Sequence, residues 1–266
     1  MRLIVAAFAV FLLAACSTPV EPPAAAVADL APGGTLRAAI NVGNAVLAQR
    51  PAAPGGEPSG VSVDLARELA RRLGVPLQLT VYDAAGKVVE AGRAGAWDIA
   101  FVALDPARAS EIAQSPPYVQ IEGAYLVREG SKLRSNEEVD RKGHRVVVGR
   151  NSAYDLFLTR NLQRAEIVRT PTSAAVVDVF VKENHDVAAG VKQQLEADAK
   201  KNPGVRILDG RFMVINQAMA SQKGKDAGAR YVREFIEEMK ASGFVARALE
   251  RHGIQGAAVA PRGDAQ

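Results

Sequence analysis

Short apolar runs alternate along the chain with segments of helical periodicity, and this alternation restricts the folds that the sequence can adopt. Residues 36–42 (LRAAINV) predict a strand, residues 62–74 an amphipathic helix, and residues 77–82 a second strand. Ser62 is a candidate N-cap for this helix, and Gly74 is placed to end it. Strands that alternate with helices predict an α/β fold with an open, mostly parallel sheet.

The same alternation occurs twice. The first series continues with a helix at 85–95 and a strand at 99–104, and a polar stretch at 129–143 then interrupts the pattern. The second series is expected to contain strands at 145–149, 186–191 and 205–208, helices at 152–162 and 173–184, an extended segment at 211–221, and closing helices at 227–243 and 244–253. Two βα series, joined by extended segments, predict two lobes.

The composition argues against several partners. The 266 residues are 48% hydrophobic and 23% charged, with a formal net charge of +4. Lys and Arg are scattered among acidic residues and are not clustered with aromatic residues, so nothing supports nucleic-acid binding. The chain has one cysteine and therefore no internal disulfide, so the fold must depend on core packing.

The N-terminus has the pattern of an export signal. Arg2 precedes an apolar segment, residues 3–13, that is too short to span a bilayer. The following "LAAC", which ends at Cys16, resembles the lipobox of bacterial lipoproteins, where the cysteine receives a diacylglycerol group and becomes the new N-terminus. The alternative is an ordinary secretory signal with an incidental cysteine. We expect residues 1–15 to be a signal peptide and residues 16–33 a flexible tether.

An arginine stands where helices disfavour one. In "DIAFVALDPARAS" (98–110), a buried strand is followed by Asp105 as a candidate N-cap, by Pro106 at the first helical position, and by Arg108 in the first turn. The first turn carries the positive end of the helix dipole and therefore favours acidic residues. Arg108 is thus either a solvated residue paired with Asp105 or Glu111, or a residue held for an anion.

Several segments in order resemble one protein family. These are "GVSVDLARELARRLG", "AGAWDIAFVALDPARAS", "SPPYVQIEGAYLVREGS", "HRVVVGRNSAYDLFL" and "ASGFVARALERHG". Together they are similar to motifs of the bacterial extracellular solute-binding proteins of family 3, the periplasmic receptors of polar amino acid ABC importers. The resemblance covers residues 34–253.

The resemblance implies a type II periplasmic-binding-protein fold, in which two α/β lobes joined by two hinge strands close on a small ligand. We expect lobe 1 at 34–124 and 219–254, lobe 2 at 125–218, and a disordered tail at 255–266.

The resemblance also implies a site. Arg108 falls on the arginine that clamps the carboxylate of the ligand, and a guanidinium matches two carboxylate oxygens with its rigid fork. Ser152 is a candidate N-cap for the helix at 152–162, with Asp155 three positions further on. By the resemblance, Ser152 and the adjacent Asn151 are also expected to complete that carboxylate site from lobe 2. Asn44 and Tyr118 are further candidates for ligand contact from lobe 1.

One half of the family's site is altered. Family members that bind α-amino acids place an acid where this chain has Val191, which cannot accept a hydrogen bond from an ammonium group. The ammonium half of the site is therefore missing or rebuilt, and the candidates to rebuild it are Asp105, Glu122, Gln193 and Gln194. The expected ligand is a small carboxylate, either an amino acid or a related organic acid.

The resulting prediction is the substrate-binding component of an ABC importer. Such a protein uses no cofactor and no metal, performs no catalysis, acts as a monomer, and delivers its ligand to permease subunits in the membrane. We expect it to be exported, to the periplasm or the cell surface, and anchored through a lipid on Cys16. The alternatives are a periplasmic dehydratase-like enzyme on the same scaffold and a ligand-sensing partner of a membrane receptor.

Overall fold

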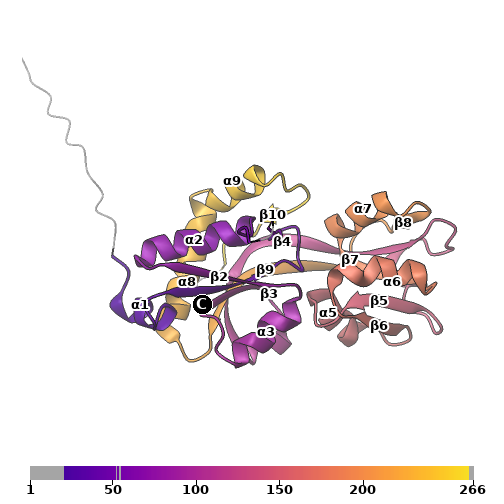
Figure 1. Cartoon of the computed structure of the whole chain (residues 1–266). Helices are drawn as coiled ribbons and strands as arrows, with labels where there is room; N and C mark the ends of the chain where they lie inside the picture. Colours follow the sequence, from indigo (N-terminus) through magenta and orange to yellow (C-terminus); the bar gives the residue numbers. More distant parts are fainter. Residues whose placement is uncertain (1–20, 52, 54, 264–266) are drawn as a thin grey trace, which may run out of the picture.

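The computed structural model describes residues 21–51, 53 and 55–263, so the expected signal peptide and Cys16 lie outside the described residues. Figure 1 shows two groups of elements connected by two long strands, β4 and β9. We call the group with β1–β3 lobe 1 and the group with β5–β8 lobe 2. This arrangement confirms the two-lobed α/β fold.

The strands of the described residues form a single sheet, in the order β2-β1-β3-β9-β4-β7-β5-β6, with β8 and β10 also paired to β4. The pairs β1–β2, β1–β3, β5–β6 and β5–β7 are parallel, whereas β4 and β9 run antiparallel to each other and to their other neighbours. The strands are β1 (Leu36–Asn41), β2 (Leu77–Tyr82), β3 (Ile99–Ala103), β4 (Ile112–Arg128), β5 (Arg145–Gly149), β6 (Glu166–Thr170), β7 (Val187–Val191), β8 (Val205–Ile207), β9 (Met213–Gln222) and β10 (Ala258–Val259).

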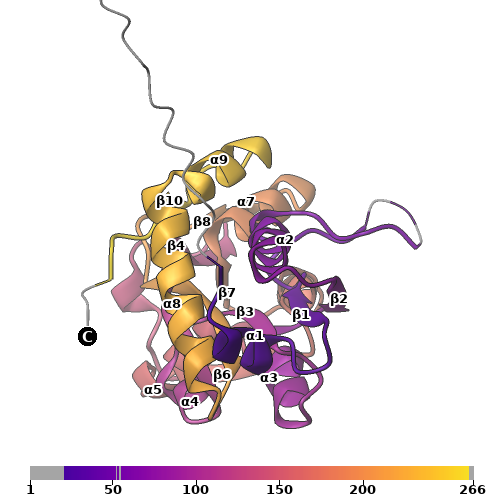
Figure 2. The ribbon, with the colours of Figure 1, turned by 90° about the vertical axis from the view of Figure 1, so that its left-hand side faces the viewer.

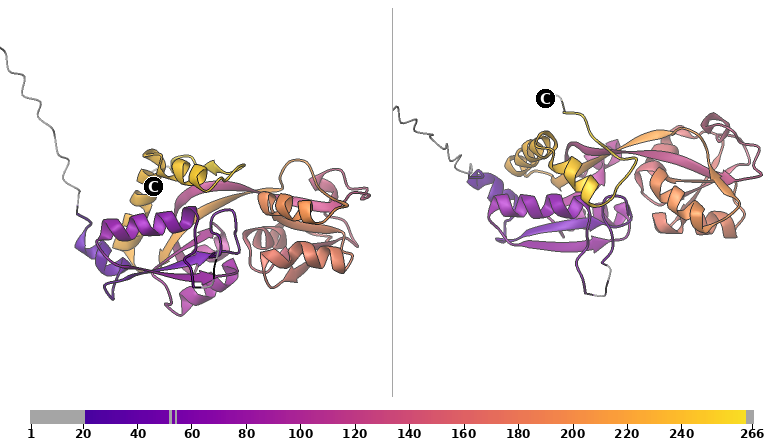
Figure 3. Two further views of the ribbon diagram at one scale, coloured as in Figure 1. Left: turned by 45° about the horizontal axis from the view of Figure 1, so that its top comes forward. Right: turned by 90° about the horizontal axis from the view of Figure 1, so that it is seen from above.

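Helices cover the sheet and the lobe ends (Figures 1 and 3). They are α1 (Ala24–Leu30), α2 (Val61–Leu73), α3 (Ala85–Arg93), α4 (Pro106–Ala109), α5 (Ala153–Asn161), α6 (Val176–Lys182), α7 (Lys192–Lys201), α8 (Asp226–Ala241) and α9 (Phe244–Arg251), with short 3-10 turns at Asn136–Glu138 and Ser173–Ala175. In β1, Ala38 and Ile40 pack into one core cluster and Ala39 into another, so both faces of the strand are buried. Burial on both faces explains why the strands read as continuous apolar runs.

The start of α2 differs from our expectation. Its N-cap is Gly60 and not Ser62. Gly60 has a φ of 122°, and a Cβ there would lie 2.4 Å from the carbonyl oxygen of Leu47, so only glycine fits. The Ser62 hydroxyl is instead buried against the hydroxyl of Tyr118, at 3.1 Å. The expected stop is confirmed, because Gly74 is the C-cap in the left-handed conformation.

Both ends of the described chain are more ordered than we expected. Within the expected tether, residues 24–30 form α1, which lies beside α8 (Figure 2), and Asp29 accepts a hydrogen bond from the Gly228 N–H at 3.0 Å. Within the expected disordered tail, β10 pairs with β4, and Gly263 N–H donates to Glu237 at 3.1 Å. Apolar residues in each segment, such as Leu30 and Ala260, are buried, and their burial favours packing of the segment against the rest of the protein.

Candidate functional site

Arg108 lies at the junction of the two lobes. The residues before it form β3, and Asp105 caps α4 by accepting a hydrogen bond from the Ala107 N–H at 2.9 Å, with Pro106 at the first helical position. The expected cap is therefore confirmed. The Arg108 side chain does not extend into solvent, because the residue is only 3% exposed.

The Arg108 guanidinium connects the lobes through main-chain carbonyls. Its Nη1 donates to the carbonyl of Ala103 in lobe 1, at 2.9 Å, and its Nη2 donates to the carbonyl of Asn151 in lobe 2, at 2.8 Å. Burial lowers the pKa of Arg108 to about 10, while the nearby negative charge of Asp105 acts in the opposite direction. The side chain therefore stays charged at neutral pH, at the cost of losing its hydration.

The alternative of a solvated Arg108 paired with a neighbouring acid does not hold. Asp105 accepts hydrogen bonds from Arg160 of lobe 2, at 3.2 and 2.7 Å. Glu111 accepts from Arg93, at 2.8 Å through Nη2. Among the described residues, Arg108 forms no salt bridge with a carboxylate. A buried cation without an ion-pair partner favours an incoming anion.

Ser152 begins α5 opposite Arg108. Its hydroxyl accepts a hydrogen bond from the Asp155 N–H at 3.0 Å, which confirms its expected role as N-cap. The Asp155 carboxylate in turn accepts a hydrogen bond from the Asn151 N–H, at 2.7 Å. Its charge is balanced by Arg169, whose Nε lies 3.0 Å from the carboxylate. Asn151 adopts a φ of 56°, which turns its carbonyl toward Arg108.

The Arg108 side chain lines a cavity between the lobes, which we call the Arg108 cavity. It measures about 30 Å³, room for about two water molecules. A ligand of amino-acid size must therefore enter while the lobes are further apart. The lining residues are Asn41, Gly43, Asn44, Ala85, Ala103, Arg108, Ser152, Ala153, Tyr154, Ser173, Val191, Ile215 and Gln217. This set contains neither a carboxylate nor an imidazole.

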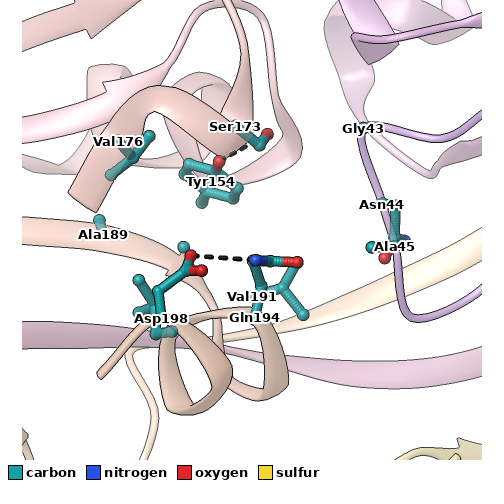
Figure 4. Close-up of a pocket in the computed structure, with 12 residues that line it drawn as sticks. Gly43, Asn44, Ala45, Tyr154, Ser173, Val176, Ala189, Val191, Gln194 and Asp198 are labelled. Atoms are coloured by element: carbon teal, nitrogen blue, oxygen red, sulfur yellow. Dashed lines mark hydrogen bonds between the residues drawn. The ribbon is translucent and has the colours of Figure 1, made fainter. Parts of the chain in front are cut away.

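A second space adjoins the first, since Asn44, Tyr154, Ser173 and Val191 line both. Figure 4 shows it: the Tyr154 hydroxyl donates to Ser173 Oγ at 2.8 Å, and the Gln194 Nε2 donates to Asp198 at 2.9 Å. We call it the Asp198 cavity. Sequence reasoning missed Asp198 and Ser173, although the spacing of Gln194 and Asp198 places both on one face of a helix.

The remaining candidates have other roles. Tyr118 is fully buried in lobe 1, where its ring packs edge-on against Phe101, and it lines neither cavity. Asp105 is likewise absent from the lining of both cavities. Glu122 accepts hydrogen bonds from Lys192 and Arg211, at 3.2 and 2.7 Å, so its charge is already balanced. Of the lobe 1 candidates, Asn44 and Arg108 face the cavities.

A comparison with protein families decides the assignment. The family model of the bacterial extracellular solute-binding proteins, family 3, matches residues 49–255. The chain belongs to this family. A search of curated protein sequences gives no match. The solute-binding role and the expected family are thereby confirmed, and the site between the lobes of this solute-binding protein becomes the candidate ligand site.

Solved structures show the same fold. The solute receptor for L-cysteine of Neisseria gonorrhoeae has a TM-score of 0.73 and 22% identity over 85% of this chain and 92% of that one. The amino acid ABC transporter substrate-binding protein AbpA of Streptococcus pneumoniae, bound to L-arginine, has a TM-score of 0.72 and 21% identity over 85% and 98%. The ancestral amino-acid-binding protein AncCDT-1, a precursor of cyclohexadienyl dehydratase, has a TM-score of 0.72 and 20% identity over 86% and 99%.

Proposed function

We propose that this chain is the substrate-binding component of an ABC importer and that it captures a small carboxylate-bearing solute between its lobes. The observation that carries the proposal is the Arg108 guanidinium, which is buried at the lobe junction without a carboxylate partner among the described residues. A carboxylate between the lobes would replace the hydration that Arg108 loses, and a charge-assisted bond is strong in such a site.

Capture depends on contributions from both lobes. Lobe 1 supplies Arg108 and Asn44, and lobe 2 supplies Ser152 together with the N-terminus of α5. The free N–H groups at the start of that helix favour the same anion as Arg108. A ligand bound by both lobes stabilises the closed arrangement by its differential affinity for it. We infer that the closed, loaded protein is the form that an ABC permease recognises.

Binding, and not catalysis, is the activity that the site supports. No carboxylate or imidazole that could transfer a proton lines the Arg108 cavity, and Asp198 lines only the adjoining one. The dehydratase-like alternative predicts turnover of prephenate or arogenate by the purified protein, which an absorbance assay detects. Turnover that is lost in Arg108→Gln would overturn the assignment as a binding protein.

The cellular location is part of the proposal. The "LAAC" segment supports export and lipidation at Cys16, which would hold the protein at a membrane surface. None of the helices in the described part of the chain has the length and apolar character needed to cross a bilayer. Producing cells that are fed a labelled fatty acid should incorporate it into the wild-type protein and not into Cys16→Ser, whereas an unlabelled wild type would contradict lipidation.

Isothermal titration calorimetry tests the binding function. The purified protein is titrated with a panel of L-amino acids and of mono- and dicarboxylic acids, and its Arg108→Gln variant is titrated with each ligand that binds. Arg141→Gln is the matched control, because Arg141 is exposed on lobe 2 and pairs with Glu138. We expect a carboxylate to bind to the wild type and to Arg141→Gln, and binding to be lost in Arg108→Gln. Binding that survives in Arg108→Gln would refute the clamp.

A further inference from the structure

A carboxylate group lies in the space next to the Arg108 cavity. Asp198 projects from α7 of lobe 2 into the Asp198 cavity, and its side chain is only 13% exposed. Its protein partners leave much of its charge unbalanced: Gln194 donates a neutral hydrogen bond, and Lys201 lies 3.6 Å away on a side chain that is 72% exposed. An exposed lysine at that distance contributes little.

A second hydrogen-bond acceptor, from Asn44, also lines the Asp198 cavity. The Oδ1 of Asn44 lies buried in the wall that the two cavities share and has no hydrogen-bond partner. A buried carbonyl oxygen without a partner is costly, and a ligand N–H would satisfy it. The Asp198 cavity thus offers acceptors on both sides, from lobe 1 through Asn44 and from lobe 2 through Asp198 (Figure 4). The Arg108 cavity, in contrast, offers the guanidinium of Arg108 and no carboxylate.

The positions of Arg108 and Asp198 in two different cavities determine where the cationic group of a ligand lies. The carboxylate and the ammonium of an α-amino acid are attached to one carbon, so both would occupy the Arg108 cavity. That cavity is lined by no acid, and Asp198 lines only the adjoining cavity, which shares Val191 and Tyr154 with it. A ligand with its carboxylate at Arg108 therefore reaches Asp198 only with a group several bonds away.

We propose that the preferred ligands are ω-amino or ω-guanidino carboxylates, with the carboxylate at Arg108, the distal cation at Asp198 and Asn44, and no requirement for an α-ammonium group. This inference rests on the proposed function and specifies its substrate class. It assigns Asp198 as the residue that selects the distal charge, a role that neither Glu122 nor Asp105 can take because each is already paired within the protein.

The space beyond Asp198 accommodates more than one ligand length. A groove of about 310 Å³ between the lobes shares Ala45 and Gln194 with the Asp198 cavity. Its wall carries the carboxamide of Gln193, whose Oε1 is buried without a partner, and the carboxylate of Glu196. A guanidinium group, which carries five donors, would find acceptors here as well as at Asp198.

The test uses a matched set of four ligands with one carbon skeleton. Caproate carries no amine, L-norleucine carries the α-amine, ε-aminocaproate carries the distal amine, and L-lysine carries both. Valerate, L-norvaline, δ-aminovalerate and L-ornithine form a second set that is one carbon shorter. Each ligand is titrated calorimetrically into the wild type, into Asp198→Asn, which keeps the shape of the side chain, and into Asp178→Asn. Asp178 is exposed on α6 of the same lobe and lines none of these spaces, so it serves as the control.

In at least one set, the distal amine should strengthen binding to the wild type by about tenfold or more, with or without the α-amine, as expected for a hydrogen-bonded charge. Asp198→Asn should remove that gain and leave binding of the amine-free acid unchanged, and Asp178→Asn should behave as the wild type. Three results would overturn the inference: no gain from the distal amine, a gain that survives in Asp198→Asn, or no binding by any ligand of either set. None of these results refutes the proposed function if another carboxylate binds in an Arg108-dependent manner. Failure of the substrate-class inference can therefore be distinguished from failure of the proposed function.

Discussion

The carboxylate of Asp105 accepts hydrogen bonds from both terminal nitrogens of Arg160, at 3.2 and 2.7 Å. Asp105 belongs to lobe 1 and is 5% exposed at its side chain, whereas Arg160 belongs to lobe 2 and is 43% exposed. The pair joins the lobes beside Arg108 without touching the cavity. Because β4 and β9 also connect the lobes, this ion pair acts on their relative position more than on their folding.

Arg160→Ala should therefore shift the lobes toward the open arrangement. An ion pair of this exposure contributes about 1 kcal/mol or less, so ligand affinity should fall by about threefold to fivefold. Small-angle X-ray scattering of the ligand-free protein should give a larger mean radius of gyration, and the thermal midpoint should change little. Arg164→Ala, an exposed arginine just beyond α5, is the control. Unchanged affinity and radius in Arg160→Ala would show that the pair does not hold the lobes.

Gly86 of α3 provides a second test of lobe closure. A Cβ at this position would lie 2.7 Å from the Cβ of Asn151 in lobe 2, so the lobes approach closely only because residue 86 is glycine. Gly86→Ala should raise the helix propensity of α3 by about 1 kcal/mol yet weaken ligand binding, because the added methyl group opposes closure.

Calorimetry and thermal unfolding measure the two effects of Gly86→Ala separately. Gly130→Ala is the control, because a Cβ there has no neighbour within 4 Å. A Gly86→Ala variant that binds its ligand as tightly as the wild type would mean that the lobes close by another route.

The sequence predicted those features that depend on residues close together in the chain. The leucines of α2, the cap of α4 by Asp105 and the cap of α5 by Ser152 follow from spacing and from local hydrogen bonding, and all three elements are present. The importance of Arg108 was visible because an arginine at the start of a helix conflicts with the dipole. Such a conflict between local preference and position is typical of a functional site.

The features that the sequence did not reveal depend on long-range contacts. Asp105 and Arg160 are 55 residues apart, and no spacing rule connects them. Helix α7, which carries Asp198, buries only Leu195, so it lacks the apolar periodicity by which a helix is recognised. The ordered tail is held by pairing with β4 and by the Glu237 carboxylate, and neither partner is near it in the chain. Each of these three features is determined by contacts between residues that are distant in the sequence or by the absence of a local pattern.

Arg108→Gln should separate binding from stability. Burial lowers the pKa of Arg108 well below its usual value, to about 10. Keeping the Arg108 side chain charged in the folded protein therefore costs about 3 kcal/mol at any pH below 10. That penalty is relieved only as the pH rises above about 10, so it is fully present at neutral pH. Removing the charge recovers this energy, while the loss of bonds to the Ala103 and Asn151 carbonyls costs about 1–3 kcal/mol.

The two contributions nearly cancel for the ligand-free protein. The free energy of unfolding of Arg108→Gln should therefore stay within about 2 kcal/mol of the wild type, as measured by urea denaturation. Carboxylate affinity should fall by about thirtyfold or more, because the anion then lacks its charged partner. If the variant unfolds much more readily than the wild type, Arg108 is chiefly a structural residue, and the charge that we assign to ligand binding serves the fold instead.

Glu68 should govern part of the acid sensitivity of lobe 1. It accepts hydrogen bonds from Arg71, at 2.8 Å, and from Arg72, at 2.9 Å, and Arg72 also pairs with Glu238 of α8. The bonds from Arg71 in particular lower the pKa of Glu68 from 4.5 to about 2. The unfolded chain therefore binds a proton more readily than the folded one between these values. The stabilisation is complete above pH 4.5 and is lost as the pH falls from 4.5 to 2.

Glu68→Gln removes this pH dependence. Because the group is partly exposed, the effect at neutral pH should be about 1 kcal/mol, or about two to four degrees in the thermal midpoint. Thermal unfolding from neutral pH down to about pH 2.5 should show the wild type losing its advantage over Glu68→Gln as the pH falls through this window. Glu250→Gln, an exposed glutamate of α9, should run parallel to the wild type. If the difference between wild type and Glu68→Gln is constant with pH, the stabilisation arises from packing of the side chain and not from its charge.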